Sequence, residues 1–148
     1  MANGAPVLAA RLLGPRLDWP VDAGLHLADG YRLLGPSKTL RGLTAAVLAT
    51  APTAWLLGLG WGVGAAVAVL AMAGDLASSF VKRRLGRAAS SQALGLDQVP
   101  EALLPAALLR EAFGLDWSEV GLTAVAFMAL GLALSAVGYR LGLRDRPY

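Results

Sequence analysis

The chain has 148 residues, of which 56% are hydrophobic and only 16% are charged. Soluble domains average about 25% charged residues, so this composition, with a mean hydropathy of +0.57, indicates a membrane protein and excludes a disordered chain. The lack of cysteine excludes disulfides and thiolate metal sites, and a single histidine, His26, excludes the usual zinc sites.

The first ten residues, 1–10, carry no charged side chain but are too few to cross a bilayer, which needs about 20 apolar residues. They also lack the basic start of a signal peptide. We expect a partial helix here, either the last turns of a transmembrane helix or a short half-inserted segment.

The next apolar stretch, residues 42–81, has the length of two transmembrane spans and contains a single charged residue, Asp75. Four glycines in residues 58–64 mark a turn near its middle, and two tryptophans beside them suit a membrane–water interface. The pattern therefore predicts two spans, over about 42–58 and 62–82.

The remaining apolar stretches differ in strength. The clearest span is predicted over about 120–140, because residues 120–139 carry no charge. Residues 99–115 are weaker, since three charged residues interrupt them and Pro105 lies inside. Taken alone, this stretch suits either a short tilted span or an interfacial helix.

The distribution of positive charge favours a crossing at 99–115. If the segment before residue 42 is cytoplasmic and there are four spans, every one of the 13 lysines and arginines except Arg110 lies on the cytoplasmic side. Without a crossing at 99–115, the basic C-terminus would lie outside. The net charge of +3 then follows from cytoplasmic loops and requires no nucleic acid.

We therefore expect an all-α integral membrane protein. It has about four transmembrane helices plus a partial N-terminal helix, and residues 1–148 form a single domain in which cytoplasmic loops build the site.

Polar residues gather in three cytoplasmic groups, the first of which is the loop 30–42. It resembles a P-loop, but the spacing of its Lys-Thr pair is wrong and no strand precedes it. What remains favours a phosphate at a helix N-terminus, although a lipid-headgroup anchor fits as well. The residues concerned are Gly35, Pro36, Lys38, Thr39 and Arg41.

The second group is centred on Asp75, which lies about two helical turns, or roughly 10 Å, from Lys82. An ionised carboxylate inside a span is functional by default and needs a partner. Asp75, Ser79 and Lys82 share one helical face. A carboxylate beneath cations suits a Mg²⁺ ion that bridges phosphates, whereas an ion pair that only anchors the helix is the structural alternative.

The third group, residues 95–101, begins the weak span. Pro100 is typical of a first helical turn, which places Asp97 near a helix N-terminus. Helix capping alone would explain Asp97. Its closeness to the second group makes a role as a second metal ligand at least as suitable.

At these residues the sequence resembles the CTP-dependent cytidylyltransferases that make CDP-activated lipids. The closer match is the small CDP-archaeol synthase family, and phosphatidate cytidylyltransferases are more distant. The resemblance covers nearly the whole chain, including its ending, 139–148. It rests on a Pro-x-Lys-Thr-x-x-Gly loop, a Gly-Asp…Ser-x-x-Lys-Arg element and a Leu-Asp-Gln element, which are Pro36, Lys38, Thr39 and Gly42; Gly74, Asp75, Ser79, Lys82 and Arg83; and Leu96, Asp97 and Gln98.

The chain departs from the family's pattern at three places. Leu40 stands where the family usually has a tryptophan. Pro100 stands where a second acid often follows Asp97, with Glu101 beside it. Relatives generally begin with a complete transmembrane helix, and we expect this chain to start inside that helix.

The resemblance implies a membrane nucleotidyltransferase that transfers CMP from CTP to an archaetidic- or phosphatidic-acid-like lipid phosphate and releases pyrophosphate. It implies Mg²⁺ as the cofactor, held by Asp75 and Asp97, and Asp75, Lys82 and Lys38 as the catalytic residues. The remaining substrate-binding residues would be Gly35, Pro36, Thr39, Arg41, Ser79, Arg83 and Gln98.

The expected location is the plasma (inner) membrane, with several crossings and with the site and the C-terminus facing the cytoplasm. The expected partners are CTP and a lipid phosphate, no nucleic acid is expected, and a homodimer is left open. Two other classes remain at this point: a small four-helix transporter or channel with Asp75 as its ion-binding carboxylate, and a non-catalytic relative of the family. Mg²⁺-dependent CTP binding would support only the enzyme.

Overall fold

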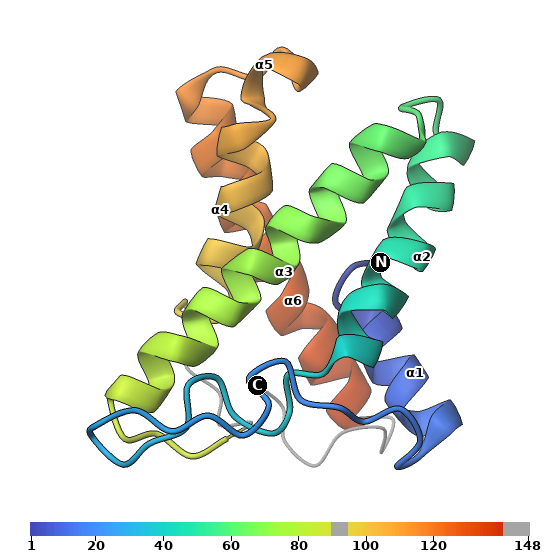
Figure 1. Ribbon diagram of the computed structural model, residues 1–148. Helices are drawn as coiled ribbons and strands as arrows, with labels where there is room; N and C mark the ends of the chain where they lie inside the picture. Colours follow the sequence, from blue (N-terminus) through green and yellow to red (C-terminus); the bar gives the residue numbers. More distant parts are fainter. Residues whose placement is uncertain (90–94, 141–148) are drawn as a thin grey trace.

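The structure is a computed structural model that describes residues 1–89 and 95–140. In these ranges it consists of helices and turns, with two isolated β-bridges and no strand (Figure 1). The helices are α1 (Gly4–Leu13), α2 (Leu40–Leu56), α3 (Trp61–Arg84), α4 (Gln98–Leu108), α5 (Arg110–Phe113) and α6 (Trp117–Arg140). The expected all-helical architecture is confirmed for the described residues.

Three of the predicted spans match helices α2, α3 and α6 to within a few residues. Within the described residues, the segments Trp61–Arg84 and Trp117–Val137 are long and apolar enough to cross a membrane by themselves. The partial N-terminal helix is α1, which packs against α2. The predicted total of four crossings stays a prediction.

The stretch 99–115 forms two helices rather than one. Helix α4 has 11 residues, so at 1.5 Å per residue it is about 16 Å long, roughly half the hydrocarbon core. Leu109 separates it from the four-residue helix α5. Pro105 weakens the helix because it has no N–H group, and the charges of Arg110 and Glu111 favour water over lipid at this point. Helix α4 packs against both α3 and α6, which is unlike an interfacial helix lying on the surface.

The interior of the helix bundle is made mostly of small side chains. The buried apolar residues are Ala46, Ala51, Ala54, Ala68, Ala71, Met72, Ala102, Ala106, Val120 and Ala124. Large apolar side chains point outward instead, among them Leu48, Val69, Leu122, Leu130 and Leu134. A soluble core shows the reverse arrangement. Helices that associate in lipid pack through small residues, because lipid already solvates large apolar ones.

The turn expected in residues 58–64 joins α2 to α3. Gly58 and Gly60 have φ angles of 79° and 84°, a region that favours glycine. Trp55 and Trp61 stack across the turn, with ring centroids 5.6 Å apart. Helices α2 and α3 form a helical hairpin, and the long loop between α1 and α2 lies at the end opposite to this turn (Figure 1).

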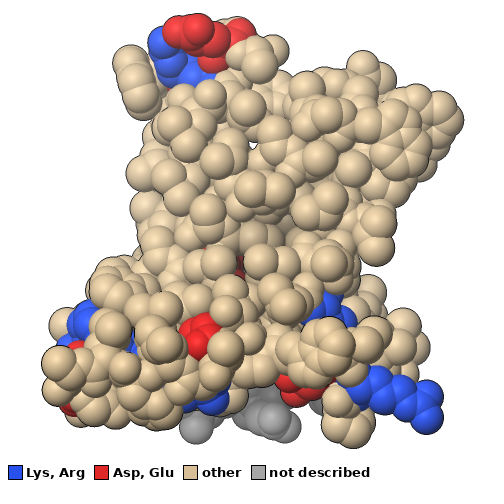
Figure 2. Space-filling model, in the orientation of Figure 1, with Lys and Arg blue, Asp and Glu red and all other residues tan. Residues whose placement is uncertain are grey.

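Charged side chains gather at the two ends of the molecule, as Figure 2 shows for one face. One group lies over α5, a second lies at the end that carries the α1–α2 loop, and an uncharged band separates them. Such a band is the arrangement required of a surface that contacts lipid tails.

Candidate active site

The α1–α2 loop brings Lys38 to the start of α2. The backbone N–H of Val21 donates to the carbonyl of Lys38 (2.8 Å), and that of Leu40 donates to the carbonyl of Trp19 (2.9 Å). Thr39 is the N-cap of α2, and its hydroxyl oxygen accepts a hydrogen bond from the N–H of Gly42 (3.2 Å). The expected Lys-Thr pair at a helix N-terminus is therefore present, although Thr39 is buried and acts as a cap.

Lys38 reaches across to α3 and meets Asp75. Its Nζ lies 2.6 Å from each carboxylate oxygen of Asp75, and both side chains remain partly exposed. The two residues are 37 positions apart in the chain. The pair joins the first two polar groups of the sequence, and it gives the intramembrane carboxylate the partner that it was expected to need.

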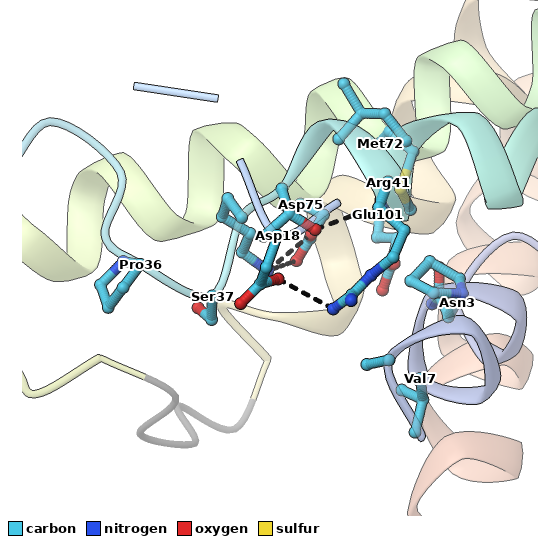
Figure 3. A pocket seen from close by; sticks show the side chains of 15 residues that line it. Asn3, Val7, Asp18, Pro36, Ser37, Arg41, Met72, Asp75 and Glu101 are labelled. Atoms are coloured by element: carbon cyan, nitrogen blue, oxygen red, sulfur yellow. Dashed lines mark hydrogen bonds and ion pairs between the residues drawn. The ribbon is translucent and has the colours of Figure 1, made fainter. Parts of the chain in front are cut away.

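A cavity of about 530 Å³ surrounds this pair (Figure 3). Its walls come from α1, from the α1–α2 loop and from α2, α3 and α4. The lining residues are Asn3, Pro6, Val7, Ala10, Asp18, Pro36, Ser37, Lys38, Thr39, Arg41, Gly42, Leu43, Met72, Asp75 and Glu101. The lining therefore combines charged and polar side chains with apolar ones.

Glu101 of α4 is a cavity residue to which the sequence analysis gave no role. Asp75, Asp97 and Lys38 all lie near enough to act on its carboxylate electrostatically, and Asn3 hydrogen-bonds to it. The signal in the sequence was a charged residue inside an otherwise apolar stretch, which is a functional candidate by default. Figure 3 shows Glu101 facing the same space as Asp75.

A glycine allows Asp75 and Glu101 to approach one another. Gly74 packs directly on the backbone of α4, so that a Cβ atom at this position would lie 2.3 Å from the carbonyl oxygen of Pro100 and 2.7 Å from the nitrogen of Glu101. Glycine is the only residue that permits such close contact between α3 and α4. In the Gly-Asp element of the sequence, Gly74 therefore permits the close packing of two helices, and Asp75 supplies a carboxylate to the cavity.

Lys82 and Asp97 form a second ion pair beside the cavity. Lys82 Nζ lies 2.6 Å from Asp97 Oδ1, and the lysine is buried. Neither residue belongs to the lining of the larger cavity. Ser79, on the same helix, is buried as well. The structure thus places Asp97 against Lys82, whereas Asp75 shares its cavity with Glu101 and with Asp18, which pairs with Arg41.

Other residues expected to bind substrate are engaged with the protein. Arg41 donates to the carbonyls of Gly14 and Arg16 (both 2.7 Å) and pairs with Asp18 (2.8 Å), which ties the end of α1 to the start of α2.

Three more of these residues make contacts within the neighbouring loops. Arg83 donates to the carbonyl of Ala88 (2.7 Å), and a Cβ atom at Gly35 would lie 3.8 Å from the Arg83 side chain. Gln98 accepts from the N–H of Gly95 (2.9 Å). These contacts position the loops around the cavity, and the expected role of the same residues in substrate binding stays a prediction.

The electrostatics of the cavity suit a polyanion together with a hard cation. Helices α2 and α4 both begin at this end of the molecule, and helix N-termini attract anions. The described residues contain no cluster of three or more histidine, cysteine, aspartate or glutamate side chains. Mg²⁺ does not require one, because it is usually held by one or two carboxylates together with phosphates and water.

The available donors fit that ion. Asp75 and Glu101 offer carboxylate oxygens to the cavity. The buried Oδ1 of Asn3, also at the cavity, has no hydrogen-bond partner among the described residues. All three groups are oxygen ligands of the kind that Mg²⁺ prefers.

Comparisons with known proteins agree with these observations. The family model described as CarS-like CDP-archaeol synthase matches residues 60–148. The CDP-archaeol synthase of Aeropyrum pernix is 40% identical, and the alignment covers 100% of this chain and 86% of that protein. The CDP-archaeol synthase of Methanopyrus kandleri is 37% identical, over 87% of this chain and 79% of that protein.

A solved structure described as an intramembrane enzyme for archaeal membrane lipid biosynthesis is similar in fold. Its TM-score is 0.72 at 37% identity, and the match covers 90% of this chain and 85% of that one.

Proposed function

This chain belongs to the CDP-archaeol synthase family, and we propose that it transfers CMP from CTP to the phosphate of an isoprenoid glycerol lipid of the archaetidic type. It is a membrane enzyme that makes a CDP-lipid. Family membership favours this reading over the transporter and over a non-catalytic relative. The observation that carries the residue assignment is the Lys38–Asp75 pair inside the cavity of about 530 Å³.

In the proposed reaction, an oxygen of the lipid phosphate attacks the α-phosphorus of CTP in line. A new P–O bond forms to the lipid, and the bond between the α-phosphorus and the bridging oxygen breaks, so that its electron pair leaves with pyrophosphate. A lipid phosphate is already ionised at neutral pH, so no general base is needed. Catalysis then depends on positioning and on neutralising negative charge.

Lys38 is the group best placed to neutralise the triphosphate, because its ammonium lies in the cavity at the N-terminus of α2. Lys82 and Arg41 add positive charge at the same end of the molecule, and Pro36 with Ser37 shapes the loop against the cavity. A positive charge stabilises a nearby phosphate most where water is excluded, and the side chain of Lys82 is buried.

A Mg²⁺ ion would be held by the carboxylate oxygens of Asp75 and Glu101, and when bound it supplies neutralisation of the phosphate oxygens. Asp97, the ligand expected from the sequence, would act on the same site through Lys82, its ion-pair partner. Asp75 is a metal ligand whether the second ligand is Glu101 or Asp97.

The membrane topology follows from the same proposal. Helix α2 and the stretch 99–115, which includes most of α4 and all of α5, would cross the bilayer together with α3 and α6, and the cavity would lie at the cytoplasmic face of the plasma membrane. Lys38, Arg41, Lys82 and Arg83 then lie on the cytoplasmic side, where CTP is available. This placement keeps Asp75 close to the water-facing end of α3, in contact with a loop lysine.

The lipid tail would lie between α2 and α3. A second cavity of about 200 Å³ is lined only by apolar residues, namely Leu43, Val47, Val69, Met72, Ala73 and Leu76. Leu43 and Met72 line both cavities, so the two spaces adjoin at these residues. Val69 on its wall is largely exposed on the surface that would face lipid. A phosphate beside Lys38 could therefore extend its tail directly into the bilayer.

The tail assignment is tested by narrowing this second cavity. Ala73→Phe should raise the KM for a full-length isoprenoid substrate while leaving the KM for CTP unchanged. Leu130→Phe, at an exposed position on α6, is the matched control. An unchanged lipid KM in Ala73→Phe would remove the tail from this cavity.

The function itself is tested by a turnover assay on purified, detergent-solubilised protein with labelled CTP and Mg²⁺. Phosphatidic acid and an isoprenoid glycerol phosphate are offered side by side, and the expected product is a CDP-lipid from the isoprenoid substrate. Asp75→Asn should abolish turnover while the protein still inserts into the membrane. Normal turnover by this variant would overturn the assignment of Asp75, and preference for phosphatidic acid would overturn the assigned lipid.

A further inference from the structure

A buried carboxylate organises the α1–α2 loop. Asp22 has a fully buried side chain, although it lies in a loop and outside every helix. Its Oδ1 accepts hydrogen bonds from the N–H of Gly24 (3.0 Å) and from Arg32 Nη2 (2.6 Å). Its Oδ2 accepts from the N–H groups of Leu34 (3.1 Å) and Gly35 (2.9 Å). Four donors from three parts of the loop therefore converge on one carboxylate.

These bonds hold the turn that leads to Lys38. Gly35, which Asp22 binds, begins the turn and has a φ angle of 104°, and the N–H of Lys38 faces the carbonyl of Gly35 at 3.4 Å. Val21, the residue directly before Asp22, donates its N–H to the carbonyl of Lys38. The N–H of Lys38 is thus held through Gly35, which Asp22 binds, and the carbonyl of Lys38 is held by Val21.

The carboxylate is held in its charged form. Burial alone would raise the pKa of Asp22, but the hydrogen bonds from Arg32 and from the backbone N–H groups of Gly35, Gly24 and Leu34 outweigh it and hold the pKa well below its usual range. Asp22 therefore carries its full charge throughout the physiological pH range. A neutral side chain of the same shape would not accept four hydrogen bonds.

We propose that Asp22 is a positioning residue of this enzyme: by fixing the turn from Leu34 to Lys38, it holds the Lys38 ammonium where the triphosphate of CTP binds. Asp22 does not line the substrate cavity, so it acts through Lys38 and has no contact with the nucleotide. This inference rests on the proposed function, because that function gives Lys38 its ligand. It assigns a role to the part of the loop that precedes the Lys-Thr motif.

Another aspartate in the same loop provides a matched control. Asp29 accepts from the N–H of Tyr31 (3.1 Å) and pairs with Arg84 (2.9 Å), but its side chain is 40% exposed. It therefore tests whether the loss of any loop carboxylate has the same effect. Surface pairs of this kind contribute little to stability.

The variant Asp22→Asn keeps the shape of the side chain but replaces an acceptor oxygen by an NH₂ group. In either orientation, that NH₂ group faces donors: the Gly24 N–H and Arg32, or the Leu34 and Gly35 N–H groups. We expect the Kd and the KM for CTP to rise by about tenfold, the size expected when hydrogen bonds to a charged acceptor are lost. Asp29→Asn should change both by less than about twofold.

The decisive measurement is a double-mutant cycle on the full chain in detergent, with the Kd for CTP in the presence of Mg²⁺ as the readout. If Asp22 acts through Lys38, Asp22→Asn should weaken nucleotide binding in the wild-type background but have almost no further effect in Lys38→Met. Should Asp22→Asn lower only the yield of folded protein, or weaken binding equally in both backgrounds, the positioning role would be overturned.

Arg32→Gln removes one of the four donors and serves if Asp22→Asn does not fold. It should give a smaller rise in the Kd for CTP in the wild-type background. In the Lys38→Met background, it should have almost no further effect on that Kd. The wild-type turnover assay separates the two proposals. A wild-type enzyme that makes CDP-lipid while both loop variants bind CTP normally would overturn only the role of Asp22. A wild-type protein that neither binds CTP nor turns over would overturn the proposed function itself.

Discussion

Replacing Gly74 by alanine should inactivate the enzyme through geometry alone, because no charged or polar group is changed. The added Cβ atom would lie 2.3 Å from the carbonyl oxygen of Pro100, whereas ordinary contacts begin at 3.4 Å. Helices α3 and α4 must therefore separate by about 1.1 Å at this point. The opposing atoms are backbone atoms, so no side-chain rotation can relieve the overlap.

The separation acts directly on the site, since Asp75 follows Gly74 and Glu101 follows Pro100. A misplacement of about 1 Å can cost about 100-fold in rate, and overpacking a tight contact costs about 1–3 kcal/mol in stability. We therefore expect kcat to fall by about 100-fold in Gly74→Ala, measured as labelled CDP-lipid formed per minute. The unfolding temperature in detergent should be recorded alongside.

Two other glycines of α3 serve as controls. Gly62 has no atom within 4 Å of the added Cβ, so Gly62→Ala should keep full activity and gain slightly in stability, by up to about 1 kcal/mol. A Cβ atom added at Gly64 would lie 2.6 Å from the Cβ of Ala54, and Gly64 does not line the cavity, so Gly64→Ala should lose stability while the folded fraction keeps its kcat. If folded Gly74→Ala retained a kcat within about threefold of wild type, the close approach of α3 and α4 would not be what assembles the site.

Three further predictions concern charge. Lys38→Met should raise the KM for CTP. It should also tighten Mn²⁺ binding in nucleotide-free protein, because the Lys38 ammonium no longer competes for the Asp75 oxygens. Weaker Mn²⁺ binding in a titration would contradict this. Glu101→Gln should raise the Mg²⁺ concentration needed for half-maximal turnover more than Asp97→Asn does, and the opposite order would favour Asp97 as the ligand. The pKa of Asp22 is lowered in the folded protein, so its contribution to stability is complete above the unfolded pKa of about 3.9 and is lost as the pH falls below it. The difference in unfolding temperature between wild type and Asp22→Asn should be constant from about pH 8 to 5 and shrink below about pH 4, and a difference that grew on acidification would contradict the role of this carboxylate.

The helices could be predicted from the sequence because hydrophobicity is a local property of the chain. Apolar runs of about 20 residues give the approximate bounds of α3 and α6, and a glycine-rich turn separates α2 from α3. The same local reasoning did not predict that residues 99–115 are divided into two helices, and a crossing there stays a prediction. Whether a proline and two nearby charges break a helix depends on where its ends meet water and on the neighbouring helices.

The motifs indicated which charged residues belong to the candidate site, but which of them form ion pairs with one another depends on tertiary contacts. The sequence singled out Lys38, Asp75, Lys82 and Asp97, and the structure makes two ion pairs of them, Lys38 with Asp75 and Lys82 with Asp97. No spacing rule links residues 37 positions apart on a loop and a helix. The pairing is decided by how the loop folds over the end of α3.

That this is a helical membrane protein with basic and carboxylate groups gathered in a few short motifs follows from the amino-acid sequence alone, because those features depend on composition and on local spacing. Three features appear only in the folded chain: Glu101 shares a cavity with Asp75, Asp22 accepts hydrogen bonds from the turn before Lys38, and Arg41 and Arg83 donate to backbone carbonyls. The physical reason is that an ionic group takes whichever partner packing brings within about 3 Å, and packing here depends on contacts such as that of Gly74 with α4.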